Sequence, residues 1–144
     1  MKVADTAICM KMDKIYQLSN RVLEFYHSSL QESAYHAALE WELSQNGFVV
    51  ASEQMFSLWY RGVRLNKTYK LDLVLDDEII LELKAKEELT SEHRLQLFNY
   101  LRLVNKQWGA LVNFGPKGID IERYYFDANA NKCVLFDRFG NTIF

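Results

Sequence analysis

The stretch that decides the fold is Tyr69-Lys-Leu-Asp-Leu-Val-Leu-Asp-Asp-Glu-Ile-Ile-Leu-Glu-Leu-Lys84, in which two alternating runs flank the polar residues 76–78. Alternation of apolar and polar residues is typical of a half-buried strand, and a polar break between two such runs is typical of a β-hairpin. Within this stretch, Asp72, Glu82 and Lys84 follow the spacing D-x9-E-x-K. We therefore expect two antiparallel strands that carry these three charged side chains together with Lys70.

Alternation also sorts the side chains of both strands by face, because successive side chains of a strand point to opposite sides. On the second strand, Glu82 and Lys84 should share a face with Ile80, and Leu81, Leu83 and Ala85 should occupy the other. On the first strand, one face is expected to hold Tyr69, Leu71, Leu73 and Leu75, and the other Lys70, Asp72 and Val74. Two charged groups of the second strand are thus adjacent on one side.

The length of the connecting loop decides whether the two acids meet. A two-residue loop of Asp76 and Asp77 would set Asp72 opposite Leu81. A three-residue loop of residues 76–78 pairs Leu75 with Ile79 and sets Asp72 opposite Glu82, and we adopt this register as the hypothesis. Directly opposed Cβ atoms lie about 4.5–5.5 Å apart, and like charges at that separation destabilise a strand pair. A positive charge is therefore expected between the two carboxylates.

Two sources of positive charge fit this position. Lys84 can neutralise part of the repulsion, and a hard divalent cation such as Mg²⁺ is bound by carboxylate oxygens while it keeps several waters. The stretch by itself fits equally well a solvated hairpin face with a surface salt bridge, because Asp, Glu and Lys are common on exposed strands. The choice between these interpretations depends on the rest of the chain.

The composition favours one globular domain over residues 1–144. The chain has 49% hydrophobic and 14% aromatic residues, which is enough for one substantial core. The first ten residues include an acid and too short an apolar run for a secretory signal, and no run approaches about 18 apolar residues, so we expect a cytoplasmic protein. Cys9 and Cys133 are isolated, which favours reduced thiols with a packing role.

The formal net charge of −2 argues mildly against tight, non-specific nucleic-acid binding, which depends on neutralising phosphates. The distribution of charge matters more than the total. Basic residues gather in two segments, one with Arg61, Arg64, Lys67 and Lys70 and one with Arg94, Arg102 and Lys106. A face that contacts a nucleic-acid backbone is compatible with these segments, although a solvated surface is the simpler interpretation.

Two helices are expected before the hairpin. Apolar residues at steps of three and four predict a first helix from Asp13, as its N-cap, to about His27, and a second from about Leu30 to Asn46, ended by Gly47. On the second helix, Glu32 lies on the apolar face that holds Tyr35, Leu39 and Leu43. The helix dipole favours a carboxylate near the N-terminus without any catalysis. Alternatively, Glu32 is a third carboxylate that reaches the same cation.

The remaining elements define the fold class. Strands are expected at residues 48–54 and 55–60, a helix from Thr90-Ser91 to about Lys106, and further strands at 109–114, 119–126 and 133–136. The passage from strand 79–85 through the helix to strand 109–114 predicts a right-handed crossover that places the helix on the sheet and makes strand 109–114 parallel to a neighbour. We therefore expect an α/β (α+β) fold with a mixed central β-sheet flanked by helices.

Asp72, Glu82-Leu-Lys84 and Gln96-x-x-x-Tyr100 on the following helix together resemble the PD-(D/E)XK nuclease superfamily, and the Gln–Tyr spacing is similar to that of its RecB-like nuclease branch. The segments 30–35, 59–62 and 109–114 further resemble the GxxExxR protein family, a small stand-alone branch. The resemblance covers roughly residues 13–126. Ser29 stands where the name motif has glycine and Tyr35 where some members have arginine, whereas the acid, Glu32, is retained.

The resemblance implies a restriction-endonuclease-like core and a Mg²⁺-dependent (or Mn²⁺-dependent) deoxyribonuclease that hydrolyses phosphodiester bonds. It implies four metal ligands, namely Glu32, Asp72, Glu82 and the main-chain carbonyl of Leu83. Lys84 would orient or help to deprotonate the attacking water, and Gln96 with Tyr100 would support the site or contact the phosphate. DNA is the implied partner, and no membrane is involved.

Two other functions fit the same residues. The chain could keep the fold as a catalytically silent module that binds nucleic acid or a protein partner, and the aromatic segments 134–139 and 143–144 could support a homo-oligomer. The histidines His27, His36 and His93 have no spacing typical of a zinc site and are expected to be structural or exposed. The tryptophans Trp41, Trp59 and Trp108 are expected in the core or at a sheet edge rather than as platforms for base stacking.

Overall fold

The computed structural model describes residues 1–143. Their elements are α1 (Thr6–Tyr26), α2 (Glu32–Gln45), β1 (Val50–Tyr60), β2 (Val63–Leu75), β3 (Ile79–Lys84), α3 (Ser91–Val104), β4 (Trp108–Gly115), β5 (Gly118–Asp127) and β6 (Lys132–Phe136). The strands form one six-stranded sheet in the order β1-β2-β3-β4-β5-β6. Neighbouring strands are antiparallel except β3 and β4, so the expected mixed sheet is confirmed.

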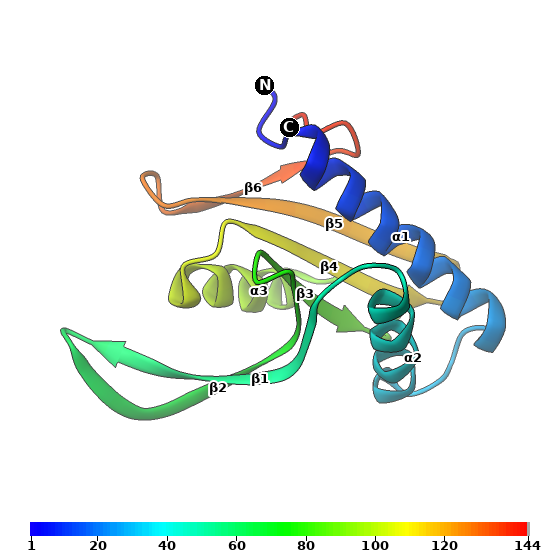
Figure 1. Cartoon of the computed structure of the whole chain (residues 1–144), viewed down its shortest axis with the longest axis horizontal. Helices are drawn as coiled ribbons and strands as arrows, with labels where there is room; N and C mark the ends of the chain where they lie inside the picture. The colour runs from blue at the N-terminus through cyan, green and yellow to red at the C-terminus, as the bar shows by residue number, and fades with distance from the viewer. Residues whose placement is uncertain (144) are drawn as a thin grey trace.

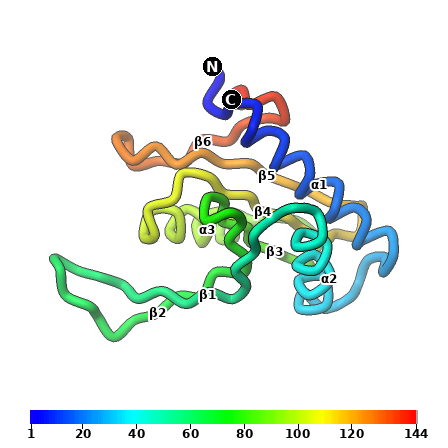
Figure 2. Tube along the Cα trace, viewed as in Figure 1, coloured from blue at the N-terminus to red at the C-terminus, as the bar shows by residue number. Residues whose placement is uncertain are grey.

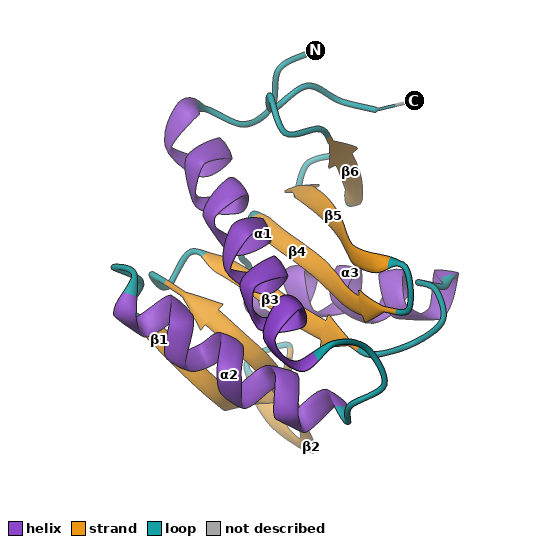
Figure 3. Cartoon of the chain, turned by 90° about the vertical axis from the view of Figure 1, so that its right-hand side faces the viewer, coloured by secondary structure: helices purple, strands orange, loops and turns teal. Residues whose placement is uncertain are grey.

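Helices cover both faces of this sheet. Helices α1 and α2 lie on one face and α3 lies on the other, as two views at right angles show (Figure 1, Figure 3). Helix α3 connects β3 to β4, which pair in parallel from Ile79↔Trp108 to Lys84↔Asn113. A parallel pair requires such a crossover, because a tight turn can join only antiparallel strands. The expected strand–helix–strand passage is confirmed.

Two apolar clusters correspond to the two faces. The larger cluster joins α1 and α2 to the sheet through fully buried residues such as Ile15, Leu18, Tyr35, Leu39 and Leu43. The smaller cluster packs Leu97, Tyr100 and Leu101 of α3 against Ile80 and Leu111 and their neighbours. Gly109 permits this close packing, because a Cβ at that position would lie 3.0 Å from Leu101 Cδ1.

The start of α1 differs from the expectation. The helix begins at Thr6, two turns before Asp13, and its N-cap is Asp5, whose carboxylate accepts a hydrogen bond of 3.0 Å from the Ile8 N–H. The apolar stripe also begins earlier, because Ile8 and Met12 are buried below Ile15. The N-cap role assigned to Asp13 is therefore wrong. Asp13 lies within α1, where its carboxylate faces two arginines.

The loop before α2 has a glycine-like conformation at Ser29, whose φ of 78° lies in the left-handed region. Tyr35 fixes this loop from within α2. Its hydroxyl donates to the carbonyl of His27 at 2.6 Å and accepts from the Leu30 N–H at 3.1 Å, and its ring stacks on Phe114 with centroids 4.5 Å apart. A buried tyrosine thus holds together the loop that brings the chain to Glu32.

The hairpin register is confirmed. Leu75 pairs with Ile79, Val74 with Ile80 and Leu73 with Leu81, as a three-residue loop requires. The faces of β3 are also confirmed, since Ile80 packs toward α3 while Leu81 and Leu83 pack toward α1 and α2.

The expected alternation along β2 is wrong at one place. Leu71 packs in the α3 cluster with Tyr69 and Val74, whereas Leu73 and Leu75 pack in the opposite cluster. The side-chain pattern changes at Asp72, which directly precedes Leu73, the first residue of β2 that pairs with β3.

The region before the hairpin forms one continuous strand, β1, rather than two. It pairs with β2 along its whole length, with a register shift between Ser57 and Trp59. Figure 1 shows this β1–β2 pair extending past the rest of the sheet, and shows the N-terminus close to the C-terminal segment. The backbone N–H of Val3 donates to the Gly140 carbonyl at 2.8 Å, which ties the two ends together.

Candidate active site

The site begins where β2 and β3 separate. Beyond the pair Leu73↔Leu81, two carboxylates take the place of backbone partners. Glu82 Oε1 accepts a hydrogen bond of 3.1 Å from the Asp72 N–H, and Asp72 Oδ2 accepts one of 2.8 Å from the Leu83 N–H. Each acid therefore satisfies the backbone of the opposite strand, and this exchange fixes both carboxylates at the end of the paired region.

The two acids have different surroundings. Glu82 is 3% exposed, whereas Asp72 is half-buried. Burial and the neighbouring charge of Asp72 raise the pKa of Glu82 to about 9. Like charges at close range cannot both ionise without compensation, so the metal-free protein holds a proton on this pair at neutral pH.

Lys84 extends from the same face of β3 toward α3. Its Nζ donates to Gln96 Oε1 at 2.9 Å, and Gln96 Nε2 donates to the Tyr100 hydroxyl at 3.1 Å. Gln96 and Tyr100 lie four residues apart on one face of α3, which lets one amide contact both groups. Burial and the charge of Glu82 raise the pKa of Tyr100. The structure thus brings together all five residues of the expected catalytic set, Asp72, Glu82, Lys84, Gln96 and Tyr100.

Glu32 approaches from the other side of the site. It is the first residue of α2 and is half-buried. Burial raises the pKa of Glu32, the positive charge of Lys84 lowers it, and the negative charge of Asp72 raises it further. Glu32 and Asp72 line the same cavity, of about 540 Å³, together with His36, Ser52 and Lys70. We call this cavity the α2 groove.

The donor atoms at the site suit a hard cation. Asp72 and Glu82 supply carboxylate oxygens, which Mg²⁺ and Mn²⁺ prefer. Burial, together with the repulsion from Asp72, raises the pKa of Glu82 to about 9. A divalent cation would remove that repulsion, so the pair fits the expected metal. Across residues 1–143, however, no three His, Cys, Asp or Glu side chains gather closely enough to hold a metal ion. Within the described residues, Glu32 thus does not form a closed three-acid cluster with Asp72 and Glu82.

Asn113 is a positioning residue that the sequence did not single out for a role. Its amide is 1% exposed, accepts from the Lys86 N–H at 2.9 Å and donates to the Lys86 carbonyl at 2.9 Å. Asn113 lies on β4, the strand that pairs in parallel with β3. Its two hydrogen bonds hold the backbone at Lys86, two residues after Lys84. A buried asparagine in an otherwise apolar strand is the signal that could have identified it, because buried amides need partners.

A second ionic cluster anchors α3 to the sheet. Arg94 contacts both carboxylate oxygens of Glu122 on β5 at 2.8 Å, and the Tyr124 hydroxyl donates to the same carboxylate. Burial raises the pKa of Glu122, but the hydrogen bonds from Arg94 and Tyr124 outweigh burial and lower it overall. This cluster keeps α3 in place, and with it Gln96 and Tyr100.

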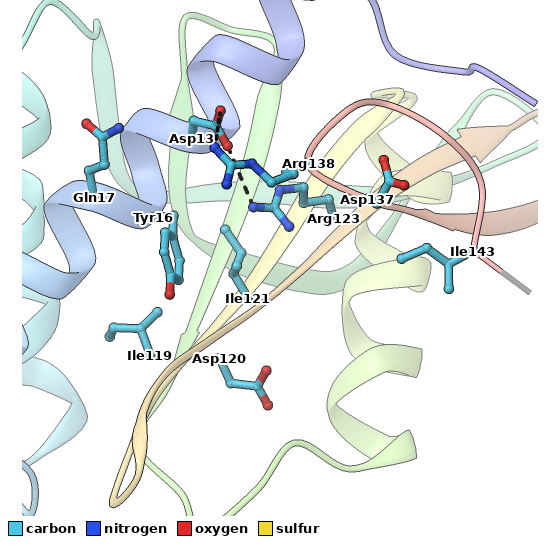
Figure 4. Close-up of a pocket in the computed structure, with 10 residues that line it drawn as sticks. All are labelled: Asp13, Tyr16, Gln17, Ile119, Asp120, Ile121, Arg123, Asp137, Arg138 and Ile143. Carbon is cyan, nitrogen blue, oxygen red and sulfur yellow. Dashed lines mark ion pairs between the residues drawn. The ribbon is translucent and has the colours of Figure 1, made fainter.

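A second cavity, of about 540 Å³, is lined by residues that include Asp13, Arg123 and Arg138 and shares no lining residue with the α2 groove. Figure 4 shows ion pairs of the Asp13 carboxylate with Arg123 and Arg138. The nitrogen–oxygen distances are 3.8 and 3.9 Å. Burial lowers the pKa of Arg123, and Asp13 partly offsets this effect. Among the side chains of residues 1–143, the buried Nε of Arg123 has no hydrogen-bond partner. The contacts indicate that Asp13 compensates buried positive charge.

Two histidines and both cysteines have the kind of structural surroundings that the sequence predicts. His93 closes the capping box of α3 by accepting from the Thr90 N–H, and His36 Nε2 lies 2.9 Å from Ser52 Oγ. Cys9 and Cys133 are both free thiols, and burial raises the pKa of Cys133 to about 12. None of the helices in residues 1–143 is long and apolar enough to cross a membrane.

Comparison with known proteins places this geometry in a family. The model of the PD-(D/E)XK nuclease superfamily matches residues 10–124, and the chain belongs to that superfamily. No curated protein matches the chain. The crystal structure of SSO0001 is similar in fold, with 19% sequence identity, a TM-score of 0.52 and coverage of 85% of this chain. This chain spans 65% of the length of SSO0001.

Proposed function

We propose that this protein is a metal-dependent nuclease that hydrolyses phosphodiester bonds in DNA. The observation that carries the proposal is the arrangement at the end of β3, where a coupled Asp72–Glu82 pair lies beside the Lys84 ammonium group and the Gln96–Tyr100 pair of α3. Membership of the PD-(D/E)XK nuclease superfamily supports this assignment.

Asp72, Glu82 and the main-chain carbonyl of Leu83 are the proposed ligands of Mg²⁺ or Mn²⁺, with Glu32 as a further ligand from α2. When bound, the cation would lower the pKa of a coordinated water and stabilise negative charge on the phosphate. Glu32 shares the α2 groove with Asp72, and the electrostatic coupling of Glu32 to both Asp72 and Lys84 supports its inclusion.

Lys84 is proposed to orient the attacking water and to offset charge that develops on the phosphate. Gln96 holds the ammonium group by accepting from Nζ, which leaves the remaining N–H donors of Lys84 available to the reacting groups. Tyr100 accepts from the amide of Gln96 and so selects the amide orientation in which the oxygen faces Lys84. We therefore assign Gln96 and Tyr100 to positioning Lys84.

We further propose that the protein belongs to the GxxExxR branch of the superfamily. Glu32 keeps the acid of the motif, and Ser29 adopts a φ of 78° at the position of the motif glycine. Left-handed backbone is the conformation for which glycine is favoured. Tyr35 replaces the arginine of some members and fixes the same loop through its hydroxyl.

The test is a cleavage assay on single-stranded, double-stranded and branched DNA with Mg²⁺ or Mn²⁺. The assay compares the wild-type protein with Lys84→Ala and with Lys86→Ala, an exposed lysine two residues further along the chain. We expect Lys84→Ala to lower the rate roughly 100-fold or more, as loss of a charge-stabilising group does, with little effect of Lys86→Ala. Equal activity of Lys84→Ala and wild type would remove Lys84 from the mechanism.

A further inference from the structure

The hairpin of β1 and β2 is much longer than the sheet needs. Strand β2 pairs with β1 from Val63 to Leu75, but it pairs with β3 only from Leu73 to Leu75. Residues 54–71 therefore form a two-stranded extension, which we call the arm. The backbone trace shows the arm leaving the body of the protein beside α3 (Figure 2).

The arm has a charge opposite to that of the chain. It contains four basic residues, Arg61, Arg64, Lys67 and Lys70, and no acid, although the chain as a whole has 19 acidic and 17 basic residues. All four basic residues are exposed. A local positive field on an otherwise acidic protein attracts polyanions to that one place.

Large apolar side chains on the arm are exposed between these charges. Trp59 is 62% exposed, Tyr60 61% and Met55 57%. Trp59 does lie on an edge strand as expected, but its ring is not used in packing the core. Basic side chains combined with exposed aromatic rings are characteristic of surfaces that bind single-stranded nucleic acids, where bases stack on the rings and phosphates meet the charges.

One face of the arm combines both kinds of group. Met55 pairs with Lys70 and Trp59 pairs with Arg64, so the members of each pair lie side by side. Arg64 Nε donates to Ser57 Oγ at 3.0 Å, which places Arg64 on the face shared by Ser57 and Met55. We call the face that carries these residues the outer face of the arm.

The outer face leads directly to the candidate active site. Lys70, at the body end of this face, also lines the α2 groove, which contains Asp72 and Glu32. A strand that follows Arg64 and Lys70 would therefore arrive at the carboxylates. Four acids line the α2 groove, namely Glu32, Glu40, Glu53 and Asp72, and Lys70 is its lining lysine. Their carboxylates make entry of a phosphate unfavourable unless positive charge accompanies it, and Lys70 is placed to supply that charge.

The base of the arm is fixed relative to the site. On the opposite face, Phe56 stacks on Tyr69 with centroids 5.2 Å apart, and both rings contact Tyr100 of α3 edge-on at 6.2 and 6.0 Å. Tyr100 is the residue that accepts from Gln96. Aromatic packing therefore couples the direction of the arm to the element that holds Lys84.

We propose that the outer face of the arm binds single-stranded nucleic acid and directs it into the α2 groove. In this arrangement Arg64 and Lys70 contact phosphates, and Trp59 stacks on an unpaired base. The arm is a binding surface in its own right, while delivery to a scissile position rests on the nuclease function proposed above. Unpaired bases are needed because the rings of paired bases are already stacked within a duplex.

The test measures binding of a 5′-fluorescein-labelled dT20 oligonucleotide by anisotropy in EDTA, which prevents metal-dependent cleavage. The wild-type protein is compared with the double variant Arg64→Ala/Lys70→Ala and with Trp59→Ala. Its matched control is Lys117→Ala/Lys132→Ala, which removes the same charge from exposed positions far along the chain from the arm. Far-ultraviolet circular dichroism and thermal melting of each variant report on folding.

We expect at least tenfold weaker binding for Arg64→Ala/Lys70→Ala and for Trp59→Ala, and less than a twofold change for the control. Loss of two phosphate contacts should also lower the slope of log K against log salt by about 1.4, since each contact on a single strand contributes about 0.7. Equal weakening by the control would attribute binding to net charge alone and overturn the proposal. Tighter binding of a 20-base-pair duplex than of dT20 would overturn its single-strand part.

Sedimentation at the assay concentration distinguishes a protein partner from a nucleic acid. If a second copy of the chain covered the arm, wild type would be a dimer and Trp59→Ala a monomer, and the proposal would fail. The cleavage assay separates this inference from the nuclease function. If the arm variants bind more weakly but no protein cleaves DNA, the arm is a binding surface and the nuclease function is wrong. If the wild-type protein cleaves DNA and both arm variants bind as tightly as wild type, the nuclease function stands and the role of the arm is wrong.

Discussion

Asp72 and Glu82 each bond the backbone of the other's strand, through Glu82 Oε1 with the Asp72 N–H at 3.1 Å and Asp72 Oδ2 with the Leu83 N–H at 2.8 Å. These bonds form where the regular pairing of β2 with β3 stops. The two acids thus cap the paired end of the hairpin and also present carboxylate oxygens that can bind a metal ion at its edge.

The metal-free protein should lose stability as the pH rises, through Glu82. The pKa of Glu82 is about 9 in the folded protein against an ordinary value of 4.5, so the folded state binds the extra proton between these values. Stability from this group is therefore complete below about pH 4.5 and falls as the pH approaches 9.

Glu82→Gln removes this dependence while it keeps an acceptor for the Asp72 N–H. In EDTA, we expect the free energy of unfolding of the variant, relative to that of wild type, to rise by on the order of 2–4 kcal/mol between pH 6 and pH 9. Urea unfolding of both proteins at the two pH values checks this. A constant difference between them would show that Glu82 does not titrate in this range.

Metal binding should release a proton from the carboxylate pair. At pH 7.5 Glu82 is protonated without metal, and a carboxylate must be ionised to bind a cation. Titration calorimetry with Mn²⁺ in buffers of different ionisation enthalpy should give about one proton released per ion bound. Asp72→Asn should bind Mn²⁺ much more weakly, and unchanged binding by that variant would place the cation elsewhere.

Gln96 and Tyr100 should contribute unequally to catalysis. Gln96→Met removes the acceptor of Lys84 Nζ, whereas Tyr100→Phe leaves the 2.9 Å bond between Lys84 and Gln96 in place. We expect kcat to fall about 10–100-fold in Gln96→Met, the range typical of groups that orient a functional residue, and by less in Tyr100→Phe. Steady-state kinetics with separate kcat and KM values decides this, since a change confined to KM would indicate substrate contact instead.

The Arg94–Glu122 pair should stabilise the fold in a pH-dependent way. The pKa of Glu122 is lowered overall, so its contribution is present above the ordinary value of 4.5 and disappears as the pH falls through the lower, folded value. Glu122→Gln should cost about 1–3 kcal/mol at pH 7, as loss of a charged hydrogen-bond partner does. Thermal unfolding at pH 7 and pH 3 should show the deficit shrinking in acid.

Ser29→Gly should stabilise the protein slightly. Ser29 has a φ of 78°, which costs a residue with a Cβ about 1–2 kcal/mol, although glycine offsets part of the gain through its freer unfolded chain. We expect a net gain of up to about 1 kcal/mol in urea unfolding. Ser28→Gly is the neighbouring control, because Ser28 has no positive φ. This substitution should lower the free energy of unfolding or leave it unchanged.

Local patterns were sufficient for most of the fold. The polar break at residues 76–78 predicted the hairpin register, and the strand–helix–strand passage predicted that strand 109–114 would be parallel to a neighbour, which is β3. Patterns failed where tertiary contacts replaced local ones. The start of α1 was misplaced because Asp13 resembles an N-cap in sequence, whereas its partners Arg123 and Arg138 lie more than a hundred residues away.

The sequence by itself determined which residues form the candidate site, because D-x9-E-x-K on a hairpin and Gln96-x-x-x-Tyr100 on a helix are local spacings with a fixed geometry. Only the tertiary structure decided how these groups interact. The burial that raises the Glu82 pKa to about 9, the capture of Lys84 by Gln96 and the support from Asn113 all depend on elements that meet across the sheet. The exposure and direction of the arm likewise follow from where β3 ends, which no spacing within residues 54–71 encodes.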